Sequence, residues 1–172
     1  MEEAPADASS LIYIAKADVF GGVARCVRKL LAPPAVWREA VVAGERVGAP
    51  EVPRIRSAEA ASNVERVALS ASEQRLARTI AAENRLGSGE SEVLAIGLRL
   101  GRAVIDEGRA SRVARGLGVI AVSTLFLPVV GWHSGRLSRR DAISLLRRLA
   151  AVTGARSDVV QEIEKELRRE RR

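Results

Sequence analysis

The sequence predicts an α/β protein in which a parallel sheet is covered by helices on both faces. The clearest indication lies at 103–122, where two continuous apolar runs, 103–105 and 118–122, flank a helical pattern over 109–117. The first run ends at Asp106, which is typical of a strand that leads into a ligand crevice. With 172 residues, 47% of them hydrophobic and 28% charged, we expect a single domain over 1–172.

The N-terminal part of the chain alternates helical patterns with a short apolar run. Ser9 or Ser10 is expected to cap the first helix, since both are good acceptors for free amide groups. Pro34 suits the first turn of a later helix, where its missing N–H costs nothing. In order, we expect helices at 9–17 and 19–28, an apolar run at 29–32, a helix at 35–43 and a loop at 44–53.

The rest of the chain is predicted to be mainly helical around the two apolar strands. Ser72 is expected to cap the helix that ends near Asn84, and the helix from Glu90 has few polar faces, so we expect it to be buried. The remaining elements are a polar helix near 56–62, a β-like run at 64–69, helices at 72–84, 90–100, 124–135 and 138–153, and a charged C-terminal helix at 157–172.

Several classes of function are excluded by what the chain lacks. Cys26 is the only cysteine and His133 the only histidine, so disulfides, zinc clusters and Ser-His relays have too few residues to form. No apolar run approaches the roughly 20 residues of a membrane span, and the acidic start has no apolar core of a secretory signal. We therefore expect a cytoplasmic protein with no membrane partner, whose chemistry must depend on carboxylates.

The chain is basic, with 28 Lys and Arg against 21 Asp and Glu and a formal charge of +7. Only three of the basic residues are lysines, and the guanidinium groups of the others can bind phosphate oxygens in a bidentate manner. Arginine can equally be enriched by codon bias and solvated helix faces, so charge alone does not identify nucleic acid as a partner. With 3% aromatic residues, we expect no platform for stacking bases.

Four acidic residues occupy positions suited to a ligand crevice. Asp106 follows an apolar strand, and Glu90 opens a helix, where the helix dipole favours a carboxylate. Asp7 precedes the first helix, and Glu39 lies on the helix after the two prolines. Taken singly, Asp7 is more often a helix cap, and Glu39 and Glu90 are more often surface acids.

Taken together, the segments around these acids resemble the PIN-domain family, small ribonucleases typified by VapC toxins. The resemblance covers most of the chain from Asp7 to Leu137, and the order and spacing of its blocks are more specific than any one block. Its four main blocks are 7–16 (DASSLIYIAK), 33–39 (PPAVWRE), 89–97 (GESEVLAIG) and 105–114 (IDEGRASRVA), the last two similar to the Gly-Glu-x-Glu and Asp-Asp-x-x-Ala-Arg segments of one branch.

The resemblance implies a three-layer α/β/α fold with clustered acids, and hence a metal-dependent endoribonuclease, plausible as the toxin of a toxin–antitoxin pair. Close carboxylates repel one another unless a cation neutralises them, and hard oxygen ligands favour Mg²⁺ or Mn²⁺. RNA and a cognate antitoxin are the expected partners, and the 157–172 helix is a candidate for an antitoxin or homodimer contact. The expected site consists of Asp7 and Asp106 as metal ligands, Glu39 and Glu90 as further ligands or as groups that orient water, Glu92 as the substitute for Glu90, Ser9 and Thr124 as hydrogen-bonding groups, and Arg112 as a contact to phosphate or to a carboxylate.

The sequence departs from the family pattern at two places. Residues 2–6 are not the usual apolar first strand, and Pro5 cannot donate a ladder hydrogen bond, so this strand is expected to be short or distorted. Glu107 replaces the second Asp of the usual pair. These departures leave open a catalytically weak or inactive module that binds RNA or a protein, and a DNA-directed nuclease is the third alternative.

Overall fold

The computed structural model describes residues 1–106 and 108–169. A parallel β-sheet lies at its centre, built from β1 (Glu3–Pro5), β2 (Lys29–Ala32), β3 (Val64–Arg66), β4 (Arg102–Val104) and β5 (Ile120–Val122). The ladder β1-β2-β3 and the pair β4-β5 are joined by an isolated parallel bridge between Ala6 and Val104, which gives the order β3-β2-β1-β4-β5. The predicted α/β fold with a central parallel sheet is confirmed.

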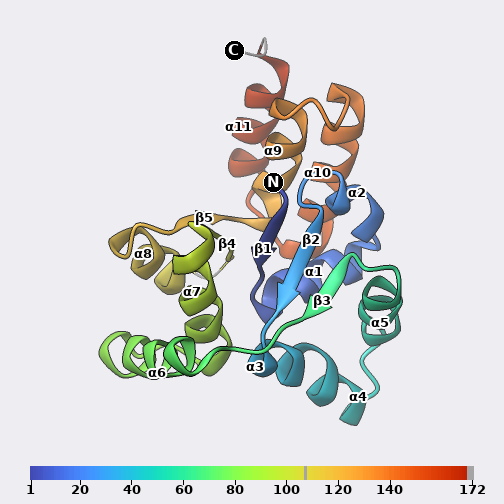
Figure 1. Ribbon diagram of the computed structural model, residues 1–172. Helices are drawn as coiled ribbons and strands as arrows, with labels where there is room; N and C mark the ends of the chain where they lie inside the picture. Colours follow the sequence, from blue (N-terminus) through green and yellow to red (C-terminus); the bar gives the residue numbers. More distant parts are fainter. Residues whose placement is uncertain (107, 170–172) are drawn as a thin grey trace.

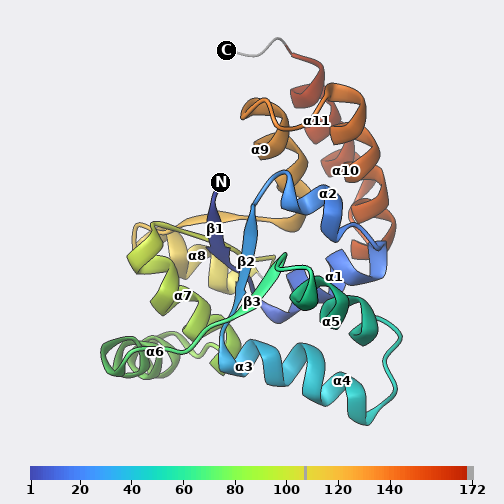
Figure 2. The ribbon, with the colours of Figure 1, turned by 45° about the vertical axis from the view of Figure 1, so that its right-hand side comes forward.

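Helices cover the sheet on both sides (Figures 1 and 2). On one side lie α6 (Ala71–Asn84), α7 (Ser88–Leu100) and α8 (Gly108–Gly116), with α7 packed against β1 and β4. On the other side lie α1 (Ala8–Ala17) and α5 (Val52–Ala60), which pack against each other. The middle strands are buried on both faces for this reason: Leu30 and Leu31 of β2, and Ala103 and Val104 of β4, point to opposite faces and are all buried.

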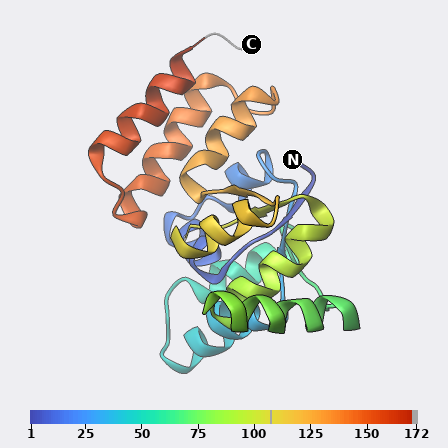
Figure 3. The same ribbon diagram turned by 90° about the vertical axis from the view of Figure 1, so that its left-hand side faces the viewer.

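The C-terminal helices form a group at one end of the molecule, drawn in orange to red in Figure 3. The group contains α9 (Leu127–His133), α10 (Arg139–Thr153) and α11 (Ser157–Arg168), and α10 packs on α1. Ile163 and Leu167 of α11 are buried within this chain, so that face serves the protein's own core. None of the helices in the described part of the chain has the length and apolar character needed to cross a bilayer.

The first strand is short, as expected from Pro5, but it is central and firmly held. The amide of Ala6 donates to Leu31 of β2, and the amide of Asp7 donates to Val104 of β4. Amides alternate between the two sides of a strand, so the nitrogen of Pro5 faces β4 and has no hydrogen to donate. The missing donor accounts for the reduction of the β1–β4 contact to a single bridge.

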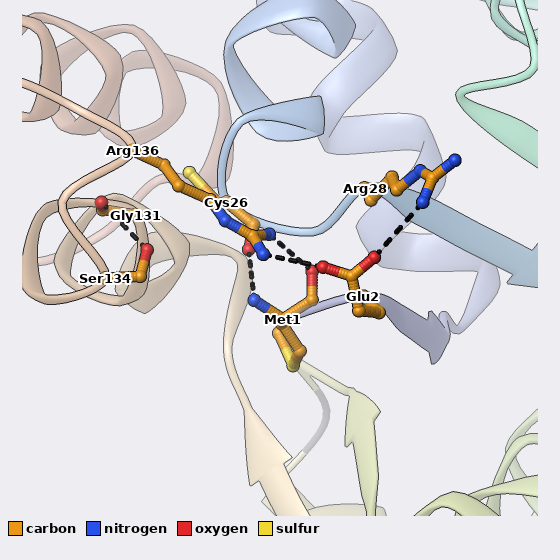
Figure 4. A network of polar contacts seen from close by, with 7 residues as sticks. All are labelled: Met1, Glu2, Cys26, Arg28, Gly131, Ser134 and Arg136. Carbon is orange, nitrogen blue, oxygen red and sulfur yellow. Dashed lines mark hydrogen bonds and ion pairs between the residues drawn. The ribbon is translucent and has the colours of Figure 1, made fainter.

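A polar network ties the start of β1 to the turn after α9 (Figure 4). Arg136 donates to the carbonyl oxygen of Met1 at 3.0 Å and to Oε1 of Glu2 at 2.6 Å. The amino group of Met1 donates to the carbonyl oxygen of Cys26 at 3.2 Å, and Arg28 forms an ion pair with Glu2 at 3.4 Å. These contacts fix the strand from which Asp7 extends.

Several predicted element boundaries were wrong. The helical stretch at 19–28 is the short α2 (Phe20–Ala24), and the predicted polar helix begins earlier, at Val52. The helix predicted at 35–43 is longer and contains a π-helical turn: α3 (Pro34–Trp37) continues through η1 (Arg38–Val42) into α4 (Ala43–Arg46). A 3-10 turn, η2 (Thr124–Phe126), precedes α9, and α11 ends at Arg168, while positions 170–172 lie outside the described residues.

The predicted helix caps were also wrong by a few residues. Asp7, not Ser9 or Ser10, caps α1, because its Oδ1 accepts from the amide of Ser10 at 2.7 Å. Ser70, not Ser72, caps α6 in a capping box with Glu73. In both cases the cap is the acceptor that lies just ahead of the first helical residue, as the geometry of free amides requires.

Candidate active site

Asp7 and Asp106 come together at the carboxyl ends of adjacent strands. Asp7 follows β1 after Ala6, and Asp106 follows β4 after Ile105. The backbone amide of Asp106 donates to Oδ2 of Asp7 at 3.2 Å, so two residues 99 positions apart in the chain are in direct contact. Parallel strands present their carboxyl ends at one edge of the sheet, which is why both acids are found there.

Asp7 is an almost fully buried acid, with 3% of its surface exposed. Burial raises the pKa of Asp7 above its ordinary value, and the negative charge of Asp106 adds to this effect. Hydrogen bonds from Ser10 act in the opposite direction, because they stabilise the carboxylate. The Asp7 side chain is therefore held in one orientation, and its negative charge is poorly compensated.

Asp106 is oriented by two neighbouring elements. Thr124, at the start of η2, donates its backbone amide to Oδ1 of Asp106 at 2.7 Å and its hydroxyl to Oδ2. The hydroxyl of Ser10 donates to the same Oδ2 at 3.1 Å. Thr124 is completely buried, so these donors are part of the rigid interior and fix the carboxylate before any ligand arrives.

Glu39 lies on the π-helical turn η1 and faces the N-terminus of α7. A Cβ atom built on Gly89 would lie 2.8 Å from Oε2 of Glu39, so only a glycine leaves room for this carboxylate. Partial burial raises the pKa of Glu39, and the carboxylates of Glu90 and Glu92 raise it further, while the amide of Gly89 opposes them. Such π-turns are often found at functional sites, because they turn a side chain out of its regular helical position.

Glu90 and Glu92 have separate contacts. Oε2 of Glu90 accepts from the amide of Gly87 at 2.9 Å and so closes the first turn of α7. The other oxygen, Oε1, is buried and has no hydrogen-bond partner among the residues that the structure describes, which is costly for a carboxylate. Oε2 of Glu92 accepts from the amide of Ala35 at 2.8 Å, so Glu92 joins α7 to the start of α3.

The predicted acids therefore lie in two sets, Asp7 with Asp106, and Glu39 with Glu90 and Glu92. Within the described residues, no hydrogen bond joins the two sets, and no three His, Cys, Asp or Glu side chains form a metal-binding group. A metal ion bound by either set of acids would therefore have to complete its coordination with oxygen atoms from water or substrate.

The structure places the remaining predicted residues differently. The hydroxyl that reaches Asp106 belongs to Ser10, which the sequence analysis did not select, and not to Ser9. Arg112 is exposed, and its guanidinium lies over Gly108, with no ion pair to a carboxylate among the residues described. Glu107 lies outside the described residues. Ser9 and Ser10 are adjacent in the chain, and no feature of the sequence distinguishes which of the two hydroxyls reaches Asp106.

A comparison with protein families agrees with this geometry. A model described as a PIN domain matches residues 5–169, which is nearly the whole chain. Neither the search of curated proteins nor the search of solved structures found a match.

Proposed function

We propose, from the premise that the chain belongs to the PIN-domain family, that it is a Mg²⁺-dependent endoribonuclease. PIN domains are generally nucleases and typically use divalent metals. The observation that carries the proposal is the contact between Asp7 and Asp106 at the carboxyl edge of the sheet. The negative charge of Asp106 raises the pKa of Asp7, so the two carboxylates repel each other, and a bound cation is the usual remedy.

The residues present fit a hard divalent cation. Asp7 and Asp106 offer carboxylate oxygens at one edge of the sheet, and their orientation is fixed by Thr124, which donates to Asp106, and by Ser10, which donates to both acids. Mg²⁺ is commonly held by one or two carboxylates and keeps several waters, so a group of three acids is not required. When bound, such an ion would polarise a phosphoryl oxygen and favour ionisation of an attacking water.

The second set of acids, Glu39 with Glu90 and Glu92, would accept the proton of the attacking water. Glu39 has a raised pKa, and its carboxylate is held against the N-terminus of α7 by the space at Gly89. A carboxylate whose pKa moves toward neutrality is better suited to accept a proton from water. Oε1 of Glu90 is buried and lacks a partner within the described part of the chain, so it is the neighbouring oxygen that would orient this water or a further ion.

A cleavage assay tests the proposal directly. The protein is incubated with a labelled single-stranded RNA in Mg²⁺, Mn²⁺ or EDTA, beside Asp106→Asn and the control Asp158→Asn. Asp158 is exposed on α11 and pairs with Arg156, so the control makes the same change far from the site. We expect metal-dependent cleavage that falls at least about 100-fold in Asp106→Asn, equivalent to roughly 3 kcal/mol of lost stabilisation, and is unchanged in the control.

A second candidate function is RNA binding without cleavage. It is favoured by one observation: both oxygens of Asp106 already accept hydrogen bonds from Thr124 and Ser10. RNA that remains intact in every metal condition, with binding retained, would support this candidate and refute the enzyme. A labelled DNA of the same sequence in parallel reactions separates a ribonuclease from a DNA-directed nuclease.

We also propose that the ribonuclease acts as the toxin of a toxin–antitoxin pair. The support is the family and the short basic chain, with a formal charge of +7. Expression in a bacterial host should slow growth, and Asp106→Asn should abolish the effect at equal protein level. Unaffected growth with soluble, active protein would refute a toxin role while leaving the enzymatic proposal intact.

A further inference from the structure

A groove with a cavity of about 920 Å³ runs along β2 and β3 and is lined on its other sides by residues of α3, η1 and α5. We infer that this groove binds the phosphodiester backbone of single-stranded RNA on one side of the cleavage site. The inference rests on the proposed function and extends it to substrate positioning. The charged residues that line the groove are Lys29, Arg38, Arg56, Glu59, Glu65 and Arg66.

A buried tryptophan supports two of these arginines. Trp37 of α3 is 5% exposed, so its ring is not available to stack on a base. The guanidinium carbon of Arg66 lies 5.0 Å from the centre of this ring, and that of Arg56 lies 5.9 Å from it. A guanidinium that rests on an aromatic face keeps its N–H groups free along its edge, where they can bind phosphate in a bidentate manner.

The groove carries uncompensated positive charge. Lys29 pairs with Glu65 and Arg56 pairs with Glu45, which leaves Glu59 as the acid that opposes the rest. Among the described residues, Arg66 makes no ion pair and no hydrogen bond to a carboxylate.

Arg38, which also lines the groove, makes no ion pair with any residue that the structure describes. Arg38 and Arg66 thus carry positive charges that no ion pair offsets among the described residues, and an anion bound in the groove would neutralise them.

The position of the groove favours RNA over an acidic peptide. Pro34 and Ala68 line both this groove and the adjoining pocket that contains Glu92, one of the second set of acids. An anionic chain bound along the groove can therefore continue toward these acids, as a substrate must. Unpaired RNA suits the cavity because its backbone can bend into a recess that a rigid duplex cannot enter.

Binding measured without cleavage tests the inference. Fluorescence anisotropy of a labelled 12-nucleotide RNA of mixed sequence is recorded in EDTA for the full chain, Arg66→Gln, Arg66→Lys and the control Arg140→Gln. Arg140 is exposed on α10 and equally changes the charge by one. Far-UV circular dichroism and the thermal midpoint verify that each variant is folded.

We expect Arg66→Gln to weaken binding about 10-fold, as for the loss of a hydrogen-bonded charge, and Arg66→Lys to weaken it less. The slope of log affinity against log salt should fall by about 0.7 in Arg66→Gln, the value for one phosphate contact on a single strand. Arg140→Gln should bind like the parent protein.

Three results would overturn the inference: no RNA binding by the parent protein, equal affinities of Arg66→Gln and Arg140→Gln, or displacement of RNA by polyglutamate at equal charge concentration. The inference and the proposed function fail separately. If cleavage depends on metal and on Asp106 but Arg66→Gln binds RNA normally, the inference about the groove is refuted and the proposed nuclease activity is supported. If binding depends on Arg66 but no cleavage occurs, the inference about the groove is supported and the nuclease activity is refuted.

Discussion

Replacing Gly89 by alanine should separate the activity of this protein from its stability. Gly89 lies in the first turn of α7, where its missing side chain leaves room for the carboxylate of Glu39. An added Cβ would stand 2.8 Å from Oε2, 3.1 Å from Oε1 and 3.2 Å from Cδ of Glu39. All three atoms belong to the end of one flexible side chain, so we expect the Glu39 side chain to move away from the added Cβ while the backbone of α7 keeps its position.

The two effects of this substitution have different sizes. Ordinary contact begins at 3.4 Å, so Oε2 must retreat by about 0.6 Å or rotate away entirely. Misplacement of a catalytic group by about 1 Å can cost roughly 100-fold in rate, so we expect cleavage to fall about 10- to 100-fold. Alanine in place of glycine within a helix gains about 0.5–1 kcal/mol, which offsets the disturbed contact and leaves stability within about 1 kcal/mol of the parent.

Cleavage rates with Mg²⁺ and urea unfolding measure the two effects in the same preparations. Gly21→Ala is the matched control, because nothing lies within 4 Å of a Cβ at that helical position. The double variant Gly89→Ala with Glu39→Gln should be no slower than Glu39→Gln, since both changes act on the same carboxylate. Cleavage by Gly89→Ala at the rate of the parent protein would refute the role of Glu39. A decrease of more than about 2 kcal/mol in the free energy of unfolding would refute the expectation that the Glu39 side chain moves aside.

Four further predictions follow from single contacts. The pKa of Glu39 is raised in the folded protein, so its contribution to stability falls as the pH rises from the ordinary pKa of 4.5 through the folded pKa. Glu39→Gln should therefore resist urea better than the parent protein above that pH window and equally well below about pH 4. Burial raises the pKa of the Cys26 thiol to about 11, so a disulfide reagent at pH 8 should label it only after unfolding. Gly131→Ala would bring a Cβ within 2.7 Å of Sγ of Cys26 and should cost about 1–3 kcal/mol in thermal unfolding, with part regained in combination with Cys26→Ala. Thr124→Val removes the buried hydroxyl that Asp106 accepts from and should lower the free energy of unfolding by about 1–2 kcal/mol, with no loss in Thr124→Ser.

The pattern of apolar residues was sufficient to predict the fold class. The runs at 103–105 and 118–122 became β4 and β5, and the run at 29–32 became β2 with the bounds expected. β2 and β4 are buried on both faces, so their hydrophobic character directly reflects their position in a covered parallel sheet, whereas β5 lies at the edge and leaves Ile120 66% exposed. Long amphipathic helices such as α10 were predicted well because their period extends over several turns.

Local geometry was harder to predict. The π-turn η1 has no period of its own, and it depends on the packing of α3 against α7 and of η1 against α1 and α5. Caps were displaced because serines stand at several adjacent positions, and only the folded chain selects the residue with a β-region backbone, as at Asp7 and Ser70. Tertiary contacts therefore determine the position of the π-turn and the choice of helix cap, which the local sequence propensities do not specify.

The site was predicted in part. The positions of Asp7 and Asp106 after parallel strands follow from topology, and their contact agrees with that expectation. The separation of Glu39 from them, and the use of Glu92 to hold α3, depend on side-chain rotamers that no spacing encodes. Ser10 was missed for the same reason, since a neighbouring serine had an equal claim in the sequence.

Pro5 has a consequence for how the two halves of the sheet are joined. Its missing hydrogen leaves the β1–β4 seam with one bridge, at Ala6, while longer ladders run on either side. The helix α7 packs on both β1 and β4 and so spans this seam, and the amide of Asp106 reaches across it to Oδ2 of Asp7. Helix packing and the contact of the acidic pair therefore connect the sheet at the place where its backbone ladder is shortest.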